Sequence, residues 1–243
     1  MKNKAKYILQ KTMGFSSYLF VFAIFKIKTL RSDKKEKDFF HFLNLIPKSQ
    51  EGIILDIGAN LGIMTYHLSK SFPETTIHAF EPIPHNVNIL KKIITKYHLL
   101  NVKLHDFALG LTQEKIKMVL PTQNKVMFQG LSHVKHDSIT EMNEGIEFEV
   151  DMNFLDNLYP NETIKAIKID VENFEYFVLK GGENLIQQNK PIIYAELWEN
   201  ENRVNCFSFL SELGYQTYIS LNYDLVLFNP AQHKKQNFIF IAN

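Results

Sequence analysis

The sequence has a single cysteine, Cys206, and no apolar run long enough to cross a bilayer. One cysteine cannot form an intramolecular disulfide, a multi-thiolate zinc site or a Cys-x-x-Cys redox pair. A membrane-spanning helix needs about 20 apolar residues, whereas the apolar run at residues 15–25 has eleven. We therefore expect neither a disulfide scaffold nor a transmembrane protein, and a reduced, cytoplasmic setting fits the cysteine content.

Internal repeats and low-complexity tracts are also lacking. The hydrophobic share of 45% and the charged share of 22% fall in the ordinary globular range, which argues against a disordered or fibrous chain. A length of 243 residues allows one α/β domain with a short extension and is too short for two full-sized domains. We therefore expect a single α/β domain.

Charge is unevenly distributed, although the net charge is only +1. Residues 1–38 hold ten Lys or Arg and three acidic residues, and the rest of the chain holds 17 basic and 23 acidic residues. Residues 1–48 are predicted to form a basic, partly apolar helical extension. Lys26 and Lys28 follow its apolar run where a signal peptide would have its cleavage site, so secretion is disfavoured.

Two interpretations of this extension remain open. Its apolar helix could pack on the domain or on a second copy of the chain in a homo-oligomer. Alternatively, it could lie on the inner face of a membrane, with aromatic side chains in lipid and lysines on anionic head groups. The second alternative would make the protein a peripheral membrane protein through residues 1–38.

From residue 49 to 243, strand-like and helix-like segments alternate, which is typical of a parallel sheet with helices on both faces. The end of the chain instead has β-rich segments separated by turns, which predicts an antiparallel hairpin. Parallel strands are expected at Ile53–Ile57, 76–80, 101–107, Ile164–Ile169 and 191–195, helices at 61–72, Pro84–His98 and 174–179, and C-terminal strands at 215–221, 224–228 and 237–241.

A long segment, at about residues 110–158, separates the third and fourth parallel strands. Connections in such folds usually take a few residues, so something is inserted here. Residues 115–120 and 146–152 alternate like exposed strands. The insertion is either a lid or substrate-recognition segment, or decoration that extends the sheet. His133 and His136 lie in a polar part of it, and we expect no metal site, with His133 left as a candidate substrate contact.

The first βα turn carries the strongest local signal. Gly58, Asn60 and Gly62 follow a buried strand in a tight turn that lets a ligand approach the backbone. The G-x-G-x-x-G spacing of a dinucleotide site is absent. S-adenosylmethionine has no phosphate and carries positive charge, so the carboxylate of Asp56 at the strand end suits it better, directly or through water.

Further carboxylates follow the next two strands. Glu81 comes 25 residues after Asp56, close to the spacing at which nucleotide sites of this architecture place an acid for the ribose hydroxyls. Asp106 and Phe107 end the third strand and are candidates for contact with the adenine. Each acid could equally be a solvated strand-end residue.

At this point the sequence resembles the FkbM-type methyltransferases. The resemblance is carried by three blocks: residues 55–62 with Phe80-Glu81-Pro82, residues 101–110, and residues 167–182 with 191–196. It implies a class I, Rossmann-like methyltransferase fold, S-adenosylmethionine as cofactor, and hydroxyl groups of sugars and other secondary metabolites as acceptors. Asn173 stands where the family usually has glycine, and asparagine tolerates a left-handed backbone better than most residues.

Methyl transfer to an alcohol requires alignment of the reactants and removal of one proton. Asp170 follows the fourth parallel strand, where open α/β sheets bind ligands, and is the leading candidate base. Glu172 and Glu196 are the next candidates, and the three carboxylates could raise one another's pKa. Alternatively, Lys168 or Lys180 pairs with one of these acids in a structural ion pair.

The prediction is an O-methyltransferase acting on a small-molecule or glycan acceptor, for example in polysaccharide biosynthesis. The alternatives are a nucleic-acid methyltransferase and a non-catalytic, membrane-associated protein that keeps the fold. No nucleic-acid partner is expected, because the chain after residue 38 is net acidic and shows no motif for stacking a base.

Overall fold

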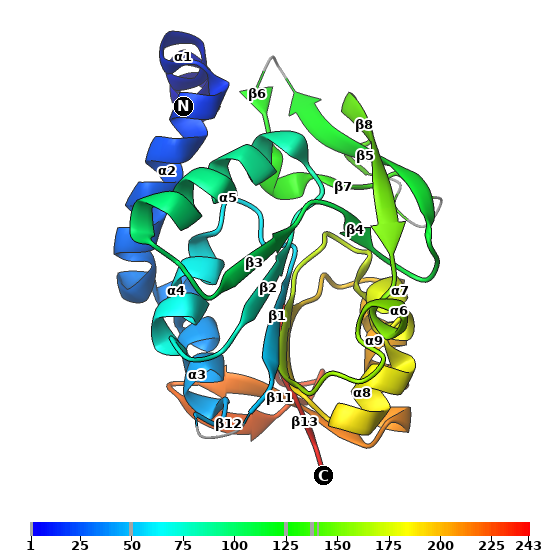
Figure 1. The fold of residues 1–243 in the computed structure, drawn as a ribbon. Helices are drawn as coiled ribbons and strands as arrows, with labels where there is room; N and C mark the ends of the chain where they lie inside the picture. Colours follow the sequence, from blue (N-terminus) through cyan, green and yellow to red (C-terminus); the bar gives the residue numbers. More distant parts are fainter. Residues whose placement is uncertain (1, 49–50, 124–125, 137–138, 140) are drawn as a thin grey trace.

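The computed structural model describes residues 2–48, 51–123, 126–136, 139 and 141–243. Its centre is an eight-stranded sheet of order β12-β11-β13-β10-β9-β1-β2-β3 (Figure 1). The strands are β1 (Ile53–Ile57), β2 (Ile77–Phe80), β3 (Val102–His105), β9 (Ile164–Ile169), β10 (Ile192–Glu196), β11 (Tyr215–Leu221), β12 (Asp224–Leu227) and β13 (Asn237–Ala242). The five strands from β3 to β10 run parallel.

The parallel strands form where apolar β-branched runs can be covered on both faces. All six residues of β9 are buried, and β9 pairs with β1 on one side and β10 on the other. Successive side chains of β1 point to opposite faces. Ile54 belongs to a core cluster with Phe39 and Tyr194, whereas Leu55 belongs to a separate cluster with Leu179.

The C-terminal strands are antiparallel, as predicted, but their order in the sheet differs from their order in the sequence. β11 and β12 form the expected hairpin. β13, the last strand in the sequence, lies between β10 and β11 and is antiparallel to both. The predicted fold class, α/β with a mostly parallel sheet, is confirmed.

Helices cover both faces of this sheet (Figure 1). One face carries α3 and α4, and the other carries α7, α8 and α9. The helices are α1 (Lys2–Met13), α2 (Phe15–Thr29), α3 (Lys37–Leu45), α4 (Ile63–Ser71), α5 (Pro84–Tyr97), α6 (Leu155–Leu158), α7 (Glu175–Lys180), α8 (Glu183–Asn189) and α9 (Glu201–Glu212). The sequence pattern did not predict α8 or α9.

The N-terminal extension packs against the domain. Leu19, Ala23 and Ile27 form a buried stripe on α2 that joins Ile89 and Ile93 of α5 in one cluster. The opposite side of α2 is exposed. Among the described residues no single helix could cross a membrane; the pair 6–13 and 15–32 meets the length and composition criteria together but is bent by 118°.

The insertion forms a second sheet above the carboxyl ends of the parallel strands (Figure 1). Its strands are β4 (Ala108–Leu109), β5 (Glu114–Gln123), β6 (Val126–Met127), β7 (His133–Val134) and β8 (Gly145–Asn153). β5 and β8 are antiparallel over eight residue pairs and contain the two expected strand segments. Helix α1 reaches this sheet, where Gln10 Nε2 donates to the carbonyl oxygen of Met127 at 3.2 Å.

Candidate active site

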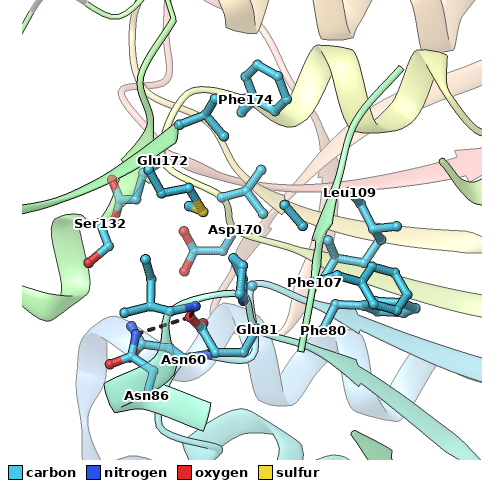
Figure 2. A pocket seen from close by; sticks show the side chains of 18 of the residues that line it. Asn60, Phe80, Glu81, Asn86, Phe107, Leu109, Ser132, Asp170, Glu172 and Phe174 are labelled. Carbon is cyan, nitrogen blue, oxygen red and sulfur yellow. Dashed lines mark hydrogen bonds between the residues drawn. The ribbon is translucent and has the colours of Figure 1, made fainter. Parts of the chain in front are cut away.

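A cavity with about 590 Å³ of empty space, including its opening to solvent, lies at the carboxyl ends of β1, β2 and β9, beneath the inserted sheet. Figure 2 shows side chains from both sheets pointing into it. Its wall consists of Ile57, Gly58, Asn60, Phe80, Glu81, Pro82, Ile83, Asn86, Phe107, Ala108, Leu109, Met118, Gly130, Ser132, Val134, Asp170, Val171, Glu172 and Phe174. Ligands of open α/β sheets bind at this edge.

The turn after β1 needs its glycines for two different reasons. Gly58 has a φ of 75°, and a Cβ there would lie 1.8 Å from the carbonyl oxygen of Asp170. Gly62 has a φ of 80° at the start of α4, and a Cβ would meet Leu90 at 2.3 Å. Asn60 also has a positive φ, of 50°. Gly58 and Asn60 line the cavity, and Gly62 supports the turn from outside it.

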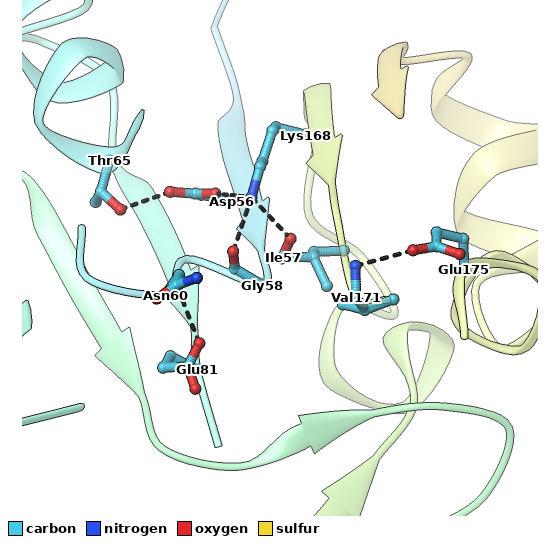
Figure 3. A network of polar contacts seen from close by, with 9 residues as sticks. All are labelled: Asp56, Ile57, Gly58, Asn60, Thr65, Glu81, Lys168, Val171 and Glu175. Carbon is cyan, nitrogen blue, oxygen red and sulfur yellow. Dashed lines mark hydrogen bonds and ion pairs between the residues drawn. The ribbon is translucent and has the colours of Figure 1, made fainter. Parts of the chain in front are cut away.

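A buried ion pair packs against this turn and holds it in place (Figure 3). The Nζ of Lys168 lies 3.2 Å from Asp56 Oδ1 and donates to the carbonyl oxygens of Gly58 at 2.8 Å and Ile57 at 3.3 Å. Thr65 Oγ1 donates to Asp56 Oδ2 at 2.6 Å. Removing one member would leave an uncompensated buried charge.

Asp56 therefore has a different place from the one expected. Its side chain is fully buried and forms no part of the cavity wall. Its charge is matched by Lys168 rather than by a ligand, because the strand directs the carboxylate toward α4 and away from the turn it supports. Lys168 thus forms a structural ion pair, but with Asp56 rather than with one of the three candidate catalytic acids. Lys180 instead pairs with Glu183 at the surface, at 2.7 Å.

Glu81 is oriented by three donors. Its carboxylate accepts from the backbone N–H of Asn60 at 2.9 Å and of Ile83 at 2.8 Å, and from Asn86 Nδ2 at 3.3 Å. Burial raises the pKa of Glu81 to about 7, and these hydrogen bonds only partly oppose that rise. A buried, oriented carboxylate in a cavity wall can accept paired hydroxyl groups of a ligand.

Of the two candidate residues that follow the third strand, Phe107 lines the cavity and Asp106 does not. The ring of Phe107 lines it and packs edge-on against Phe80, with centroids 5.7 Å apart. The Asp106 side chain is 67% exposed, lies 3.8 Å from Lys91 and borders a different surface hollow. Asp106 is therefore not part of the cavity wall, and its carboxylate is exposed beyond the end of β3.

Two of the three candidate catalytic acids share the cavity. Asp170 and Glu172 line it, and Glu196 does not. Burial raises the pKa of Asp170, although Lys168 partly opposes this. Burial and the neighbouring Asp170 raise the pKa of Glu172 to about 9. Glu196 interacts electrostatically with Asp170 from the next strand, and its pKa is raised to about 7, mainly by burial.

The loop after β9 is held in an unusual backbone conformation. Glu172 and Asn173 have φ values of 54° and 73°, which non-glycine residues rarely adopt. Asn200 Nδ2 donates to Asn173 Oδ1 at 2.6 Å. Glu175 accepts from the N–H of Val171 at 2.9 Å and from Asn202 at 2.7 Å.

Glu175 and Asn86 were not among the predicted site residues, although the sequence pattern around each one indicates burial. Glu175 lies three and four positions before the apolar Val178 and Leu179, and Asn86 lies three and four before Ile89 and Leu90. Each is thus a polar residue on the apolar face of a predicted helix. Both are buried, and a buried polar side chain requires partners.

The inserted sheet roofs the cavity with Met118, Gly130, Ser132 and Val134. His133 points elsewhere: it is buried, with ring nitrogens 2.8 Å from the Leu131 carbonyl oxygen and 3.1 Å from Asn143 Oδ1. These partners occupy both of its nitrogens. In the described part of the chain, no group of three His, Cys, Asp or Glu side chains could hold a metal ion.

Two atoms in the cavity wall suit a polar ligand. The side-chain oxygens of Asn60 and Asn86 are buried and accept no hydrogen bond from the residues that the structure describes. Buried acceptors left unpaired are costly, so these positions favour a ligand that donates hydrogen bonds. With the Glu81 carboxylate beside them, these three acceptors fit the hydroxyl and amino groups of S-adenosylmethionine, which donate hydrogen bonds.

Comparison with known proteins agrees with this geometry. The family model of the methyltransferase FkbM domain matches residues 56–217. Methyltransferase 1 of Beauveria bassiana is 25% identical over 169 residues, which cover 61% of this chain and 68% of that protein. Methyltransferase sdnD of Sordaria araneosa is 23% identical over 171 residues, covering 60% and 66%.

A solved structure shares the fold. The crystal structure of Methyltransferase FkbM from Methylobacillus flagellatus aligns with a TM-score of 0.55 and 14% identity, covering 99% of this chain and 59% of that chain. The chain thus spans about three fifths of that protein. From the family model and the shared fold, we conclude that the chain belongs to the FkbM methyltransferase family, whose class I fold uses S-adenosylmethionine.

Proposed function

We propose that the protein transfers a methyl group from S-adenosylmethionine to a hydroxyl group of a sugar, a glycan or a related secondary metabolite. One observation carries the proposal: a single roofed cavity holds an oriented carboxylate on one side, Glu81, and a pair of acids on the other, Asp170 and Glu172. The first suits a nucleoside ribose, and the second suits a hydroxyl group that must lose a proton.

The cofactor would be held by side chains from three strand ends. Glu81 would accept from the ribose hydroxyls, Asn60 from the amino-acid end, and Phe107 would pack against the adenine. Asp56 would act indirectly, because together with Lys168 it fixes the turn that contains Gly58. When bound, the cofactor supplies an electrophilic methyl group on a positively charged sulfur.

Asp170 and Glu172 would have different roles in proton transfer. With a pKa of about 9, Glu172 keeps its proton at neutral pH and can donate a hydrogen bond to the acceptor or to Asp170. Burial raises the pKa of Asp170, and the positive charge of Lys168 opposes that rise. As a carboxylate, Asp170 would accept the proton that the acceptor hydroxyl loses.

The roof from the inserted sheet would exclude water and shape the acceptor site. Met118 and Val134 present apolar surface to the cavity, and Ser132 offers a hydroxyl group. Exclusion of water protects the methyl donor from hydrolysis and strengthens the interactions of the acids. The proposed role of the insertion is therefore acceptor recognition rather than decoration of the sheet.

The test is methyl transfer from tritium-labelled S-adenosylmethionine to a panel of glycans, small alcohols and RNA. With the acceptor found, Asp170→Asn should lower turnover by about 10²- to 10⁴-fold, the usual contribution of a general base, and leave cofactor affinity nearly unchanged. Asp151→Asn, an exposed acid on β8, is the matched control. Undiminished turnover of the Asp170 variant would remove the assignment, and label found only in RNA would favour a nucleic-acid substrate.

A further inference from the structure

The cavity is one end of a row of residues along the sheet edge. Asp170 directly follows Ile169, which pairs with Ala195 of β10. The next residue of β10, Glu196, pairs with Asn237, the first residue of β13. Neighbouring strands lie about 4.8 Å apart, so Asn237 is about 10 Å from Asp170.

A second hollow begins where this row ends, and we call it the basic pocket. It encloses about 1250 Å³, including its opening to solvent. Three segments meet there: the turn before α3, the start of α9 and the loop before β13. It is lined by Lys34, Lys35, Asp38, Glu199, Arg203, Phe228, Pro230, His233, Lys234, Lys235, Gln236 and Asn237.

Two of its basic side chains brace the pocket. Lys235 Nζ lies 3.2 Å from Asp38 Oδ2 and donates to the carbonyl oxygen of Ser220 at 3.2 Å. Arg203 donates to the carbonyl oxygen of Lys235 at 3.1 Å and pairs with Glu199 at 3.3 Å. These contacts join α3, α9 and the loop before β13 into one wall.

The other lysines leave an excess of positive charge. Lys34, Lys35 and Lys234 are exposed and form no ion pair with any carboxylate in the described part of the chain. Five lysine and arginine side chains therefore face two carboxylates. This contrasts with the net acidic composition of the chain after residue 38.

Asn237 adds a second, independent feature. Its side-chain oxygen is buried and accepts no hydrogen bond from the described residues. That oxygen can accept only from a donor such as a hydroxyl group, which a sulfate ion or a carboxylate does not provide. Phe228 and Pro230 give the pocket an apolar side. Ammonium groups, an unpaired acceptor and an apolar surface together match a sugar ring that bears a negative charge.

We propose that the basic pocket binds the anionic part of the methyl acceptor, a sugar unit carrying a phosphate, sulfate or carboxylate group. This rests on the proposed function, because it places the reacting hydroxyl at Asp170 and the charged unit beyond Asn237. The acceptor then extends across two strand spacings. The N-terminal extension becomes part of the acceptor site, since Lys34 and Lys35 belong to it.

One carboxyl group lies between the two sites. Glu196 of β10 interacts electrostatically with Asp170, and burial is the main cause of its raised pKa. A raised pKa reduces the negative charge that an approaching anionic acceptor meets. Because β10 lies between β9 and β13, the acceptor would pass Glu196 with its neutral part.

The experiment measures binding of a sulfated tetrasaccharide and a neutral tetrasaccharide by calorimetry at low ionic strength. The variant is Lys34→Gln/Lys35→Gln/Lys234→Gln in the full chain. We expect its affinity for the sulfated probe to fall by about tenfold or more, because hydrogen bonds to charged groups are among the stronger ones. Affinity for the neutral probe should not change.

The matched control removes the same charge elsewhere, with Lys92→Gln/Lys96→Gln/Lys103→Gln, all exposed. It should change affinity for the sulfated probe by less than about twofold, as expected for distant, screened charges. An equal loss in both triple variants, no loss in either, or tighter binding of an RNA oligonucleotide or of anionic vesicles at these lysines would overturn the proposal.

Titration of S-adenosylhomocysteine separates this proposal from the proposed function. The lysine variant should bind S-adenosylhomocysteine as the unaltered chain does, because its lysines are outside the cavity. If the unaltered chain fails to bind it while the sulfated probe still binds at the lysines, the proposed function fails and the basic pocket stands. If S-adenosylhomocysteine binds and the lysine variant has the same affinity for the sulfated probe as the unaltered chain, the basic-pocket proposal fails and the proposed function stands.

Discussion

At the scale of single residues, the site depends on side chains whose burial changes their chemistry. Glu81, Glu172, Glu175 and Glu196 all have raised pKa values, with burial as the main cause. Their carboxyl groups differ in partners: Glu81 and Glu175 are fixed by backbone donors, and Glu172 faces the cavity. Buried acids with such different surroundings are typical of catalytic sites.

Glu175 gives a pH prediction. Its pKa rises from 4.5 to about 7 on folding, so the folded state keeps a proton between these values that the unfolded state releases. The stability that Glu175 contributes is complete below about pH 4.5 and is lost as the pH rises through 7. Urea unfolding at pH 5 to 8 should show the free-energy advantage of the unaltered chain over Glu175→Gln falling by roughly 2–3 kcal/mol. A difference independent of pH would contradict this.

Gly58 gives a steric prediction with an internal control. Gly58→Ala should lower the free energy of unfolding by about 2–4 kcal/mol, from the left-handed backbone and the clash with the Asp170 carbonyl group. Gly214 has a similar φ of 82° but open space around it, so Gly214→Ala should cost only about 1 kcal/mol. Equal losses in urea unfolding would mean that close approach at Gly58 does not matter.

The sequence predicted the location of residues that directly follow a parallel strand, because the end of the strand places them at the same sheet edge. Glu81, Phe107, Asp170 and Glu172 follow strands and line the cavity. Asp56 also ends a strand, but sequence could not reveal that its partner is Lys168, more than 100 residues later. A strand end gives the edge on which a residue lies and not the direction of its side chain.

At the scale of elements, the sequence pattern predicted β1 and β9 to the residue, because both are short segments rich in isoleucine. It did not predict that β13 lies between β10 and β11, since alternation records which face is buried and not which strand is the neighbour. The roof was recognised only as an insertion. Met118 comes from β5, and Ser132 and Val134 come from the segment at β7, so their convergence depends on the pairing of β5 with β7.

The N-terminal extension gives the prediction for this scale. Leu19 of α2 is fully buried against the domain, so Leu19→Ala should lower the free energy of unfolding by about 2–5 kcal/mol, as for other core leucines. Val21, two positions away, is 51% exposed, and Val21→Ala should change it by no more than about 0.5 kcal/mol. Urea unfolding measures both. A small effect at Leu19 would mean that α2 does not pack on the domain.

At the scale of the whole molecule, one sheet edge organises every functional feature. The carboxyl ends of β1, β2 and β9 hold the cavity, the inserted sheet covers it, and the N-terminal extension and C-terminal loop form the basic pocket farther along. The fold class could be predicted because the alternation of strands and helices specifies it. The second pocket could not, because its residues come from positions 34 to 237 and form no local motif.

The central claim is that the roofed cavity binds the methyl donor through Glu81. Calorimetric titration of S-adenosylhomocysteine into the unaltered chain, Glu81→Ala and Asp106→Ala tests it most directly, because both acids follow neighbouring strands and only Glu81 lines the cavity. The account predicts binding to the unaltered chain, at least about tenfold weaker binding to the Glu81 variant through loss of charge-assisted hydrogen bonds, and unchanged binding to the Asp106 variant. Unchanged affinity in the Glu81 variant, or equal losses in both, would contradict it.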